Sequence, residues 1–507
     1  MESGGAEMYL IPKPNGEFKE KNGTVGKVAQ GVIACKDDVR DLTRLLEDRL
    51  APLGGLRVNV TLLEEPLPKA EEYYLEAAEA GVTIRYGDRA GASNALVSLY
   101  QLLRQADTLP CLLVHDWPKC TRRGQSFDSC RHFFTIDEMK KIIEQLALLK
   151  CNVLHWVCVN DQAWRIEIDA YPKLTEANGS QKYSKEEVRD LIAYAAQRNI
   201  QIVPEFEIPG HESAALSAYP ELTCRGNKIT PPTVGGIFPV IMCAGKEETY
   251  TFIRTVLAEL VELFPTKEFH LGGDEAPKDE WKLCPRCQAK MKELGMKNEE
   301  ELQAHLMNYA ASLLRPYGKT LICWNESIKL GPGYLDKDFV VQYWMDQGGY
   351  CKEEAAAGRK FIFSNFKPLY LDYPCSMYSL KAVYQYEPHI KGMRTLPEAQ
   401  IYGYESCIWA EHIATIDRLE YMLFPRVVAA MEQFWTRDRD YEEFAPRASH
   451  YVSFLWKDNI NTRTVEEANI HGWQKVKDLV RYSHYMTGYG RKSLTAVKKI
   501  KEESKGL

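Results

Sequence analysis

Between residues 121 and 437 the chain repeats one order, a strand, a loop and then a helix, and this repetition restricts the fold more than any other feature. Strand-like apolar runs occur at residues 124–128, 152–159, 200–206, 268–272, 320–324, 339–344, 360–364 and 402–409. Helical periodicity separates most of them, as where Val188, Leu191 and Ala195 recur at i, i+3 and i+7. The crossovers after the fifth and seventh strands are poorly marked as helices. The pattern predicts a parallel (β/α)₈ TIM barrel and not an open doubly wound sheet.

Two further units are expected, one on each side of the barrel. Residues 56–62 and 81–85 are patterned as strands, and residues 38–50 and 90–104 as helices. They predict a small α+β domain over residues 1–118, which ends at the break Asp116-Trp117-Pro118. The barrel is expected over residues 119–437. The charged, partly helical segment 438–507 is expected to form a helical C-terminal extension.

Charge and hydropathy exclude several classes of partner. The formal net charge is −6 and the isoelectric point is near 6.1, so no positive field indicates a nucleic acid. No apolar run reaches the roughly 18 residues that a membrane span needs, and the N-terminal residues lack the pattern of a secretory leader. We therefore expect no nucleic-acid partner, no membrane span and a cytoplasmic location. Secretion stays open, because a leader could have been removed.

The 14 cysteines predict free thiols in a reducing compartment. Several of them lie inside apolar, strand-like runs: Cys151, Cys158, Cys243, Cys323 and Cys407. Cys284-Pro-Arg-Cys287 is a CxxC motif with no second pair close to it in the sequence. Because structural zinc needs four ligands, we expect two free thiols in a loop at this motif, no metal and no cofactor.

Residues with reactive or sugar-binding side chains recur at the point where the predicted barrel strands end. In TIM barrels this is the edge where active sites form. In chain order these residues are Arg131 and His132; Asn160, Asp161 and Gln162; Glu205, Glu207 and His211; His270, Asp274 and Glu275; Trp324, Asn325 and Glu326; Trp344; Tyr370 and Asp372; and Trp409 and Glu411. Their recurrence after all eight strands predicts one site.

The composition of that site favours a pyranose as its ligand. Flat aromatic rings stack on sugar faces, carboxylates bind hydroxyl groups, and a glycosidase needs a carboxylic acid to protonate the leaving oxygen. Glu275 is the expected proton donor, because partial burial and the charge of Asp274 should raise its pKa. Gly272 and Gly273 allow a turn that aims both carboxylates at one substrate.

Seven segments of the chain, taken in order, resemble the family-20 glycoside hydrolases, the β-N-acetylhexosaminidases. They are RRGQSFDSCRHFF, LHWVCVNDQAWRIEI, YAAQRNIQIVPEFEIPGH, HLGGDEAP, ICWNES, YLD and CIWAEH. The resemblance covers roughly residues 70 to 437, and its first part is similar to the end of the small domain that precedes the family's barrel. It implies a retaining exo-enzyme that removes terminal β-linked GlcNAc or GalNAc from glycans through the 2-acetamido group of the substrate.

The resemblance also implies a role for each site residue. Glu275 would be the general acid/base, Asp274 would orient and polarise the acetamido group, and Tyr370 would bond its nucleophilic oxygen. The other implied ligands are Trp324, Trp344 and Trp409 around the acetamido methyl group, Arg131 and Glu411 at ring hydroxyls, Asp372 at the far hydroxyl side, and Asp161 with His211 in support. Two departures, Asn325 in place of a common Asp and Leu380 in place of a Trp, are expected to change the outer subsite.

Three alternatives remain open. A conventional β-glycosidase would use Glu411, Asp372 or Glu326 as a covalent nucleophile and would not need an acetamido group. A metal-dependent hydrolase would draw its ligands from His155, Asp161, His211, His270 and Asp274. A non-catalytic carbohydrate-binding barrel is the third. The sequence does not decide between GlcNAc and GalNAc, and a homodimer is one option for the oligomeric state.

Overall fold

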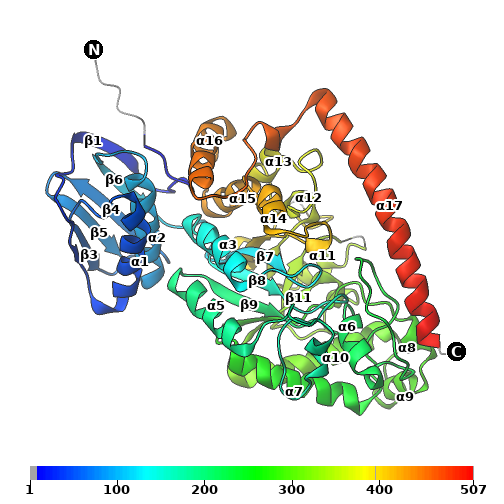
Figure 1. Ribbon diagram of the computed structural model, residues 1–507. Coiled ribbons are helices and arrows are strands. Elements are labelled where there is room, and N and C mark those ends of the chain that lie inside the picture. Colours follow the sequence, from blue (N-terminus) through cyan, green and yellow to red (C-terminus); the bar gives the residue numbers. More distant parts are fainter. Residues whose placement is uncertain (1–7, 347, 394, 506–507) are drawn as a thin grey trace.

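A six-stranded sheet, an eight-stranded barrel and a long C-terminal helix follow one another along the chain (Figure 1). The computed structural model describes residues 8–346, 348–393 and 395–505. Within them, no helix is both long enough and apolar enough to cross a membrane.

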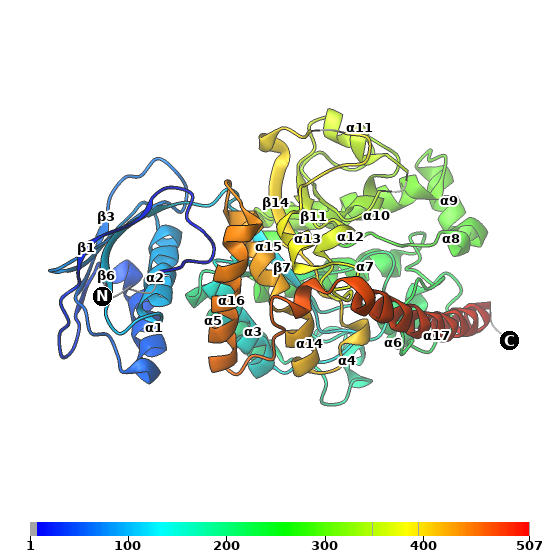
Figure 2. The ribbon, with the colours of Figure 1, turned by 90° about the horizontal axis from the view of Figure 1, so that it is seen from above.

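The N-terminal unit is a mixed sheet in the order β1-β6-β4-β5-β3-β2, and its two helices lie between the sheet and the barrel (Figures 1 and 2). Its elements are β1 Phe18–Thr24, β2 Ile33–Ala34, α1 Arg40–Leu50, β3 Val60–Glu64, β4 Tyr73–Ala78, β5 Gly81–Tyr86, α2 Arg89–Leu103 and β6 Pro110–Asp116. The predicted strands correspond to β3 and β5, and the predicted helices to α1 and α2. Sequence reasoning missed β1, β2, β4 and β6.

The barrel is closed and its strands are all parallel, in the order β10-β11-β12-β13-β14-β7-β8-β9, which confirms the predicted fold class. The strands are β7 Arg123–Asp128, β8 Val153–Val157, β9 Gln201–Glu205, β10 Glu268–His270, β11 Thr320–Trp324, β12 Val340–Tyr343, β13 Phe361–Phe363 and β14 Ile401–Ser406. Each of them falls at one of the eight predicted runs.

The helices around the barrel are unequal in length. They are α3 Ile136–Leu148, α4 Lys173–Glu176, α5 Lys185–Gln197, α6 Ser213–Ala218, α7 Glu247–Leu263, α8 Asp279–Leu283, α9 Pro285–Glu293, α10 Glu299–Leu314, α11 Cys351–Ala356, α12 Phe366–Leu369, α13 Leu380–Tyr384, α14 Ile416–Leu423 and α15 Arg426–Trp435. Between β11 and β12 only a 3₁₀ turn, Asn325–Ile328, is formed, and the helices between β13 and β14 have four and five residues. Within the described residues, the two crossovers with weak helical signals have no helix longer than five residues, and the crossover between β12 and β13 has only the six-residue α11.

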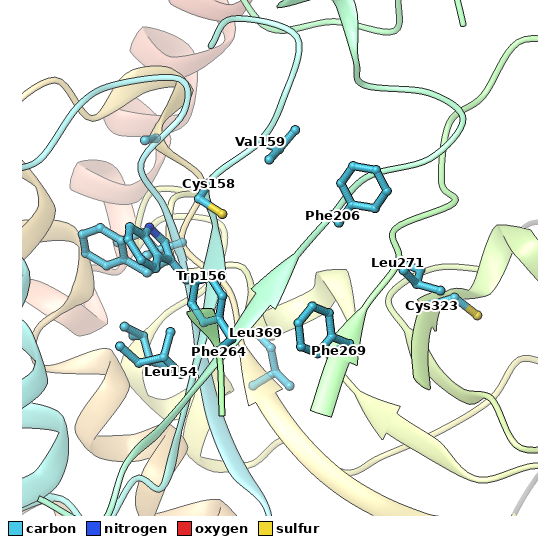
Figure 3. Close-up of a cluster of buried hydrophobic side chains, with 14 of the residues drawn as sticks. Leu154, Trp156, Cys158, Val159, Phe206, Phe264, Phe269, Leu271, Cys323 and Leu369 are labelled. Carbon is cyan, nitrogen blue, oxygen red and sulfur yellow. The ribbon is translucent and has the colours of Figure 1, made fainter. Parts of the chain in front are cut away.

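Successive side chains of each barrel strand point alternately into the barrel and toward the outer helices. In β8, Val153 joins a small apolar cluster with Val203 and Ile322 from other barrel strands, whereas Leu154 and Trp156 belong to the main core. Figure 3 shows Leu154 and Trp156 in this main core with Phe206, Phe264 and Phe269. The strands are thus held from outside by aromatic packing, and their C-terminal ends are free to carry polar residues.

The C-terminal extension consists of two helices, α16 Tyr441–Lys457 and α17 Gly472–Lys505. The 34-residue helix α17 runs along one side of the barrel (red in Figures 1 and 2). Its Ser504 carbonyl accepts a hydrogen bond from Asn227, and its Glu503 accepts one from the backbone N–H of Thr230 at 2.7 Å. The extension is therefore part of the barrel surface near the loop that follows β9.

Candidate active site

A cavity of about 690 Å³, its open mouth included, lies at the C-terminal ends of the barrel strands. It is lined by Arg131, Asn160, Glu205, Glu207, His211, Asp274, Glu275, Trp344, Phe366, Tyr370, Asp372, Tyr373, Trp409 and Glu411. Nine of the eleven predicted site residues are among them. The other two, Asp161 and Trp324, lie behind the wall, where each bonds a lining residue.

The turn that presents Asp274 and Glu275 depends on two glycines and a buried glutamate. Gly272 and Gly273 have φ values of 62° and 98°, which favour glycine. A Cβ atom on Gly272 would lie 1.9 Å from Oε2 of Glu207, and Oε1 of Glu207 accepts a hydrogen bond from the backbone N–H of Gly273 at 2.7 Å. Glu275 has a φ of 42°, the kind of backbone strain that clusters at functional sites. Glu207 therefore holds the turn, a role that the sequence did not indicate.

His211 connects the carboxylate pair to Asp161. Its Nδ1 lies 2.8 Å from Oδ2 of Asp161, and its Nε2 lies 3.4 Å from Oε2 of Glu275 and 3.9 Å from Oδ2 of Asp274. Burial lowers the pKa of His211, but the bonds to Asp161 and Glu275 outweigh it and raise that pKa well above its ordinary value. The bonds to the two carboxylates therefore favour the charged form of the imidazole. The predicted supporting pair, Asp161 and His211, is in contact in the structure.

The proton distribution in the pair differs from the expected one, in which the pKa of Glu275 is raised. Burial raises the pKa of Glu275, but the bond from His211 and the charge of Arg131 outweigh it, so the pKa of Glu275 is lowered. Burial raises the pKa of Asp274 to about 7, and the charge of Glu275 adds to this rise. The sequence shows only Asp274 as a charged neighbour of Glu275. The imidazole of His211 comes from the loop that follows β9 and could not be identified as a neighbour. The charges of His211 and Glu275 both act on Asp274, so the protonation of these three groups is interdependent.

Aromatic rings form the wall next to the acidic pair. The Tyr370 ring stacks near Trp344, with centroids 6.1 Å apart, and lies 6.0 Å from the Trp409 ring. Trp324, 1% exposed, has its ring centroid 6.0 Å from that of Trp409 and donates from Nε1 to Oε2 of Glu205 at 3.1 Å. Burial raises the pKa of Tyr370 well above 10, so its hydroxyl keeps its proton and can donate a hydrogen bond. Sequence reasoning missed two further wall residues, Phe366 and Tyr373.

Charged groups lie on the remaining side of the cavity. Arg131 Nη1 lies 3.0 Å from Oδ2 of Asp128, and its Nε lies 3.3 Å from Oε1 of Glu411. Burial raises the pKa of Asp372 to about 7. Among the described residues, Oδ1 of Asp372 and Oδ1 of Asp274 are buried and have no hydrogen-bond partner. A buried acceptor without a partner is costly, so these oxygens are suited to bind donor groups of a ligand.

Asn325 and Leu380, the two departures expected to change the outer subsite, are buried. The side-chain amide of Asn325 donates to the carbonyl of Met345, and its Oδ1 accepts from the backbone N–H of Trp344 at 3.0 Å. Glu326 accepts from Nε1 of Trp344 at 2.9 Å. Leu380 is 0% exposed. Neither residue lines the cavity, since Asn325 positions Trp344 and Leu380 is part of the core; an effect on the outer subsite stays a prediction.

Helix α17 reaches the edge of the site, which the sequence did not reveal. The ring of Tyr482 lies 6.0 Å from the ring of Tyr373, and the Tyr489 hydroxyl accepts a hydrogen bond from the backbone N–H of Gly235. A Cβ atom on Gly235 would lie 2.2 Å from Oε1 of Glu411, so this loop lies directly against a lining carboxylate. The C-terminal helix thus supports the rim of the cavity.

The histidines proposed as ligands of a hydrolytic metal fall into two separate groups. His155 and His270 lie inside the barrel, where His155 bonds Glu405 at 2.8 Å and Glu205 at 3.0 Å. His270 lies 3.1 Å from Glu205 and is 0% exposed. His211 and Asp274 belong to the cluster at the cavity. The five residues therefore do not form one ligand set.

Comparison with known proteins gives a consistent result. The sequence model of the glycosyl hydrolase family 20 catalytic domain matches residues 121–438, and that of domain 2 of the same family matches residues 7–117. A β-hexosaminidase of Porphyromonas gingivalis is 34% identical over 476 residues, which are 85% of this chain and 61% of that protein. A β-N-acetylhexosaminidase of Cellulomonas fimi is 32% identical over 457 residues, or 84% of this chain and 87% of that protein.

A solved structure shows the same architecture. The β-N-acetylhexosaminidase of Bacteroides fragilis superposes with a TM-score of 0.81 at 27% identity and covers 91% of this chain and 99% of that one. The chain spans about three fifths of the length of the Porphyromonas relative. With a matching catalytic domain over residues 121–438 and the acidic pair at the strand ends, this chain belongs to glycosyl hydrolase family 20.

Proposed function

We propose that the chain is a retaining exo-β-N-acetylhexosaminidase that removes terminal β-linked GlcNAc or GalNAc from glycans, with the substrate's 2-acetamido group as nucleophile. The observation that carries the proposal is that Asp274 and Glu275, adjacent in sequence, line the same cavity as the aromatic wall. The names of the relatives from Porphyromonas gingivalis and Cellulomonas fimi support the same reaction.

Each group has a task in the first step. Glu275 donates its proton to the glycosidic oxygen while the acetamido oxygen attacks the anomeric carbon. Tyr370 donates a hydrogen bond to that oxygen and orients it. Positive charge develops on the acetamido group, and the carboxylate of Asp274 stabilises it. In the second step Glu275 takes a proton from the attacking water, and the configuration at the anomeric carbon is retained.

The titration of the cluster explains how Glu275 obtains its proton. Below pH 7 the Asp274–Glu275 pair holds one proton, favoured on Asp274. An acetamido N–H that donates to Asp274 favours the ionised form of that carboxylate. A sugar ring over Glu275 also excludes water and raises its pKa. Substrate binding therefore moves the shared proton from Asp274 to Glu275, where the leaving oxygen needs it.

The charged side of the cavity supports exo action. Arg131, Glu411 and Asp372 are positioned to bind the ring hydroxyls of one terminal sugar. The aromatic wall of Trp344, Tyr370 and Trp409 is suited to the acetamido methyl group, which is apolar.

Paired chromogenic substrates test the proposal. We expect hydrolysis of p-nitrophenyl β-GlcNAc or β-GalNAc, or both, and little or none of the β-glucoside, because the glucoside has no internal nucleophile. Comparable kcat/KM values on the glucoside would favour an enzyme carboxylate as nucleophile. No turnover of any of the three would favour a non-catalytic sugar-binding barrel.

Asp274→Asn should lower kcat by about 10²-fold, the usual scale for loss of one electrostatic stabiliser. In the unsubstituted enzyme, kcat/KM should fall as the pH rises through about 7, because the proton shared by Asp274 and Glu275 is then lost. Without the charge of Asp274 the pKa of Glu275 is lower still, so this limb of the pH profile should move to lower pH.

The matched control for this experiment is Asp279→Asn on α8, where the carboxylate is 73% exposed. It should leave both rate and profile unchanged. If Asp274→Asn behaved like this control, Asp274 would have no part in the mechanism.

A further inference from the structure

Four cysteines from separate segments meet outside the catalytic cavity. Cys224 and Cys243 lie on the loop between β9 and α7, and Cys284 and Cys287 lie at the start of α9. Their sulfur atoms all lie within 4.8 Å of one another. The sulfur of Cys243 lies 3.6 Å from that of Cys287 and 3.8 Å from that of Cys284, and the sulfurs of Cys224 and Cys287 are 3.9 Å apart. All four are free thiols in the structure.

We propose that these four cysteines hold one structural Zn²⁺ ion as a tetrathiolate site. Zinc binds four cysteine thiolates tetrahedrally with bonds of about 2.3 Å, which places the sulfurs about 3.8 Å apart. The three separations given above, from 3.6 to 3.9 Å, match this edge length. A disulfide would need about 2.0 Å between two sulfurs. The group is therefore arranged for a shared cation and not for a covalent pair.

The surrounding backbone is built to bring the sulfurs together. A Cβ atom on Gly245 would lie 2.3 Å from the carbonyl carbon of Arg286, so the loop runs against the start of α9 with no side chain between them. Cys243 and Cys287 are 0% exposed, and Cys284 is 5% exposed. Cys224 is half-buried and closes the group on the solvent side.

Positive charge lies beside the group. Zn²⁺ with four thiolates has a net charge of −2, which must be compensated when it is buried. Lys246 is buried, and its ammonium group donates to the carbonyls of Glu221 at 2.8 Å and of Thr223 at 2.6 Å, next to Cys224. Arg286 adjoins Cys287 along the chain, whereas Arg225, next to Cys224, forms an ion pair with Glu280 at 3.0 Å.

Under this proposal, the two thiols of the CxxC motif that the sequence predicts to be free are metal ligands. The partners of that motif lie far away in sequence, since Cys243 and Cys284 are 41 residues apart and Cys224 and Cys287 are 63 apart. The CxxC motif alone therefore did not indicate its partners in the sequence. Only the fold brings the β9 loop against α9.

The site connects the two loops that carry the catalytic cluster. Next to Cys243, the Met242 backbone N–H donates to the carbonyl of Pro209, two residues before His211, at 3.0 Å. The Met242 carbonyl accepts from Nε1 of Trp281, on the segment that follows Asp274 and Glu275, at 2.8 Å. Four thiolates leave no open coordination position, so the ion has no direct part in catalysis. It fixes the loop that follows β9, which carries His211, against the loop that follows β10, which carries Asp274 and Glu275.

Metal analysis of the full-length protein, purified under reducing conditions without added chelator, tests the assignment. We expect about one zinc per chain, and X-ray absorption at the zinc edge should give four sulfur neighbours at about 2.3 Å. Cys224→Ser should lose most of the zinc and lower Tm. The control is Cys35→Ser, because Cys35 is also half-buried but lies in the N-terminal sheet domain; it should keep one zinc.

Four results would overturn the assignment. Unsubstituted protein without stoichiometric metal would show a thiol cluster or a pair of disulfides, and stoichiometric iron would exclude zinc as the resident ion. Nitrogen or oxygen neighbours in the absorption spectrum would show that the ion is bound at another site, for example at His211, Asp274 and Glu275. Full zinc content in folded Cys224→Ser would show the same. If Cys224→Ser does not fold, the metal content and spectrum of the unsubstituted protein still decide. None of these readouts depends on hexosaminidase activity.

Discussion

Glu275→Gln is expected to lower kcat by roughly 10²–10⁴-fold on substrates with poor leaving groups, the usual range for loss of general acid catalysis. Glutamine has nearly the same shape, so the turn fixed by Gly272, Gly273 and Glu207 should survive. It cannot give a proton to the glycosidic oxygen. Kinetics with a series of aryl leaving groups measures the effect.

The dependence on the leaving group distinguishes this role from others. A dinitrophenolate needs little protonation, so the loss in cleavage rate should shrink for that substrate. Glu248→Gln on α7 is a suitable control, because Glu248 is exposed and distant in sequence from every lining residue, and it should leave all rates unchanged. An equal loss for every leaving group would show that Glu275 serves a purpose other than proton donation.

The barrel could be predicted because the patterns that mark its strands and helices each lie within a short stretch of sequence. Each strand is a short apolar run, and helices such as α5 and α7 have a clear period, so alternation along the chain was sufficient. Nine of the eleven predicted site residues line the cavity for the same reason: parallel strands in a barrel end at one edge, where their following residues must meet.

What could not be predicted depends on contacts between distant segments. The lowered pKa of Glu275 results from His211, which arrives on a different loop. Glu207 supports the turn at Gly273 across 66 residues of sequence. Tyr482 and Tyr489 on α17 approach the cavity from the end of the chain, and their helix gives no sign of this in its own sequence. The four cysteines, too, come together only through contacts between segments that are distant in sequence.

The second large effect concerns the nucleophile. If the acetamido oxygen attacks the anomeric carbon, its electron density sets the barrier, because positive charge develops on the acetamido group in the transition state. Replacing N-acetyl by mono-, di- and trifluoroacetyl should then slow hydrolysis progressively. Three fluorine atoms should lower the rate of hydrolysis by on the order of 10³-fold or more. Each factor of ten corresponds to about 1.4 kcal/mol of barrier. The change in size is small, and the wall of Trp344, Tyr370 and Trp409 should accept it.

The slope of log(kcat/KM) against the number of fluorine atoms, measured with one aryl leaving group throughout, is therefore the most direct test of the substrate-assisted mechanism. An enzyme carboxylate acting as nucleophile would feel the fluorine atoms only weakly, through the sugar ring. We predict a steep, steady decrease from N-acetyl to N-trifluoroacetyl. A flat series would contradict the mechanism and would assign the attack on the anomeric carbon to Glu411 or Asp372, two further carboxylates that line the cavity.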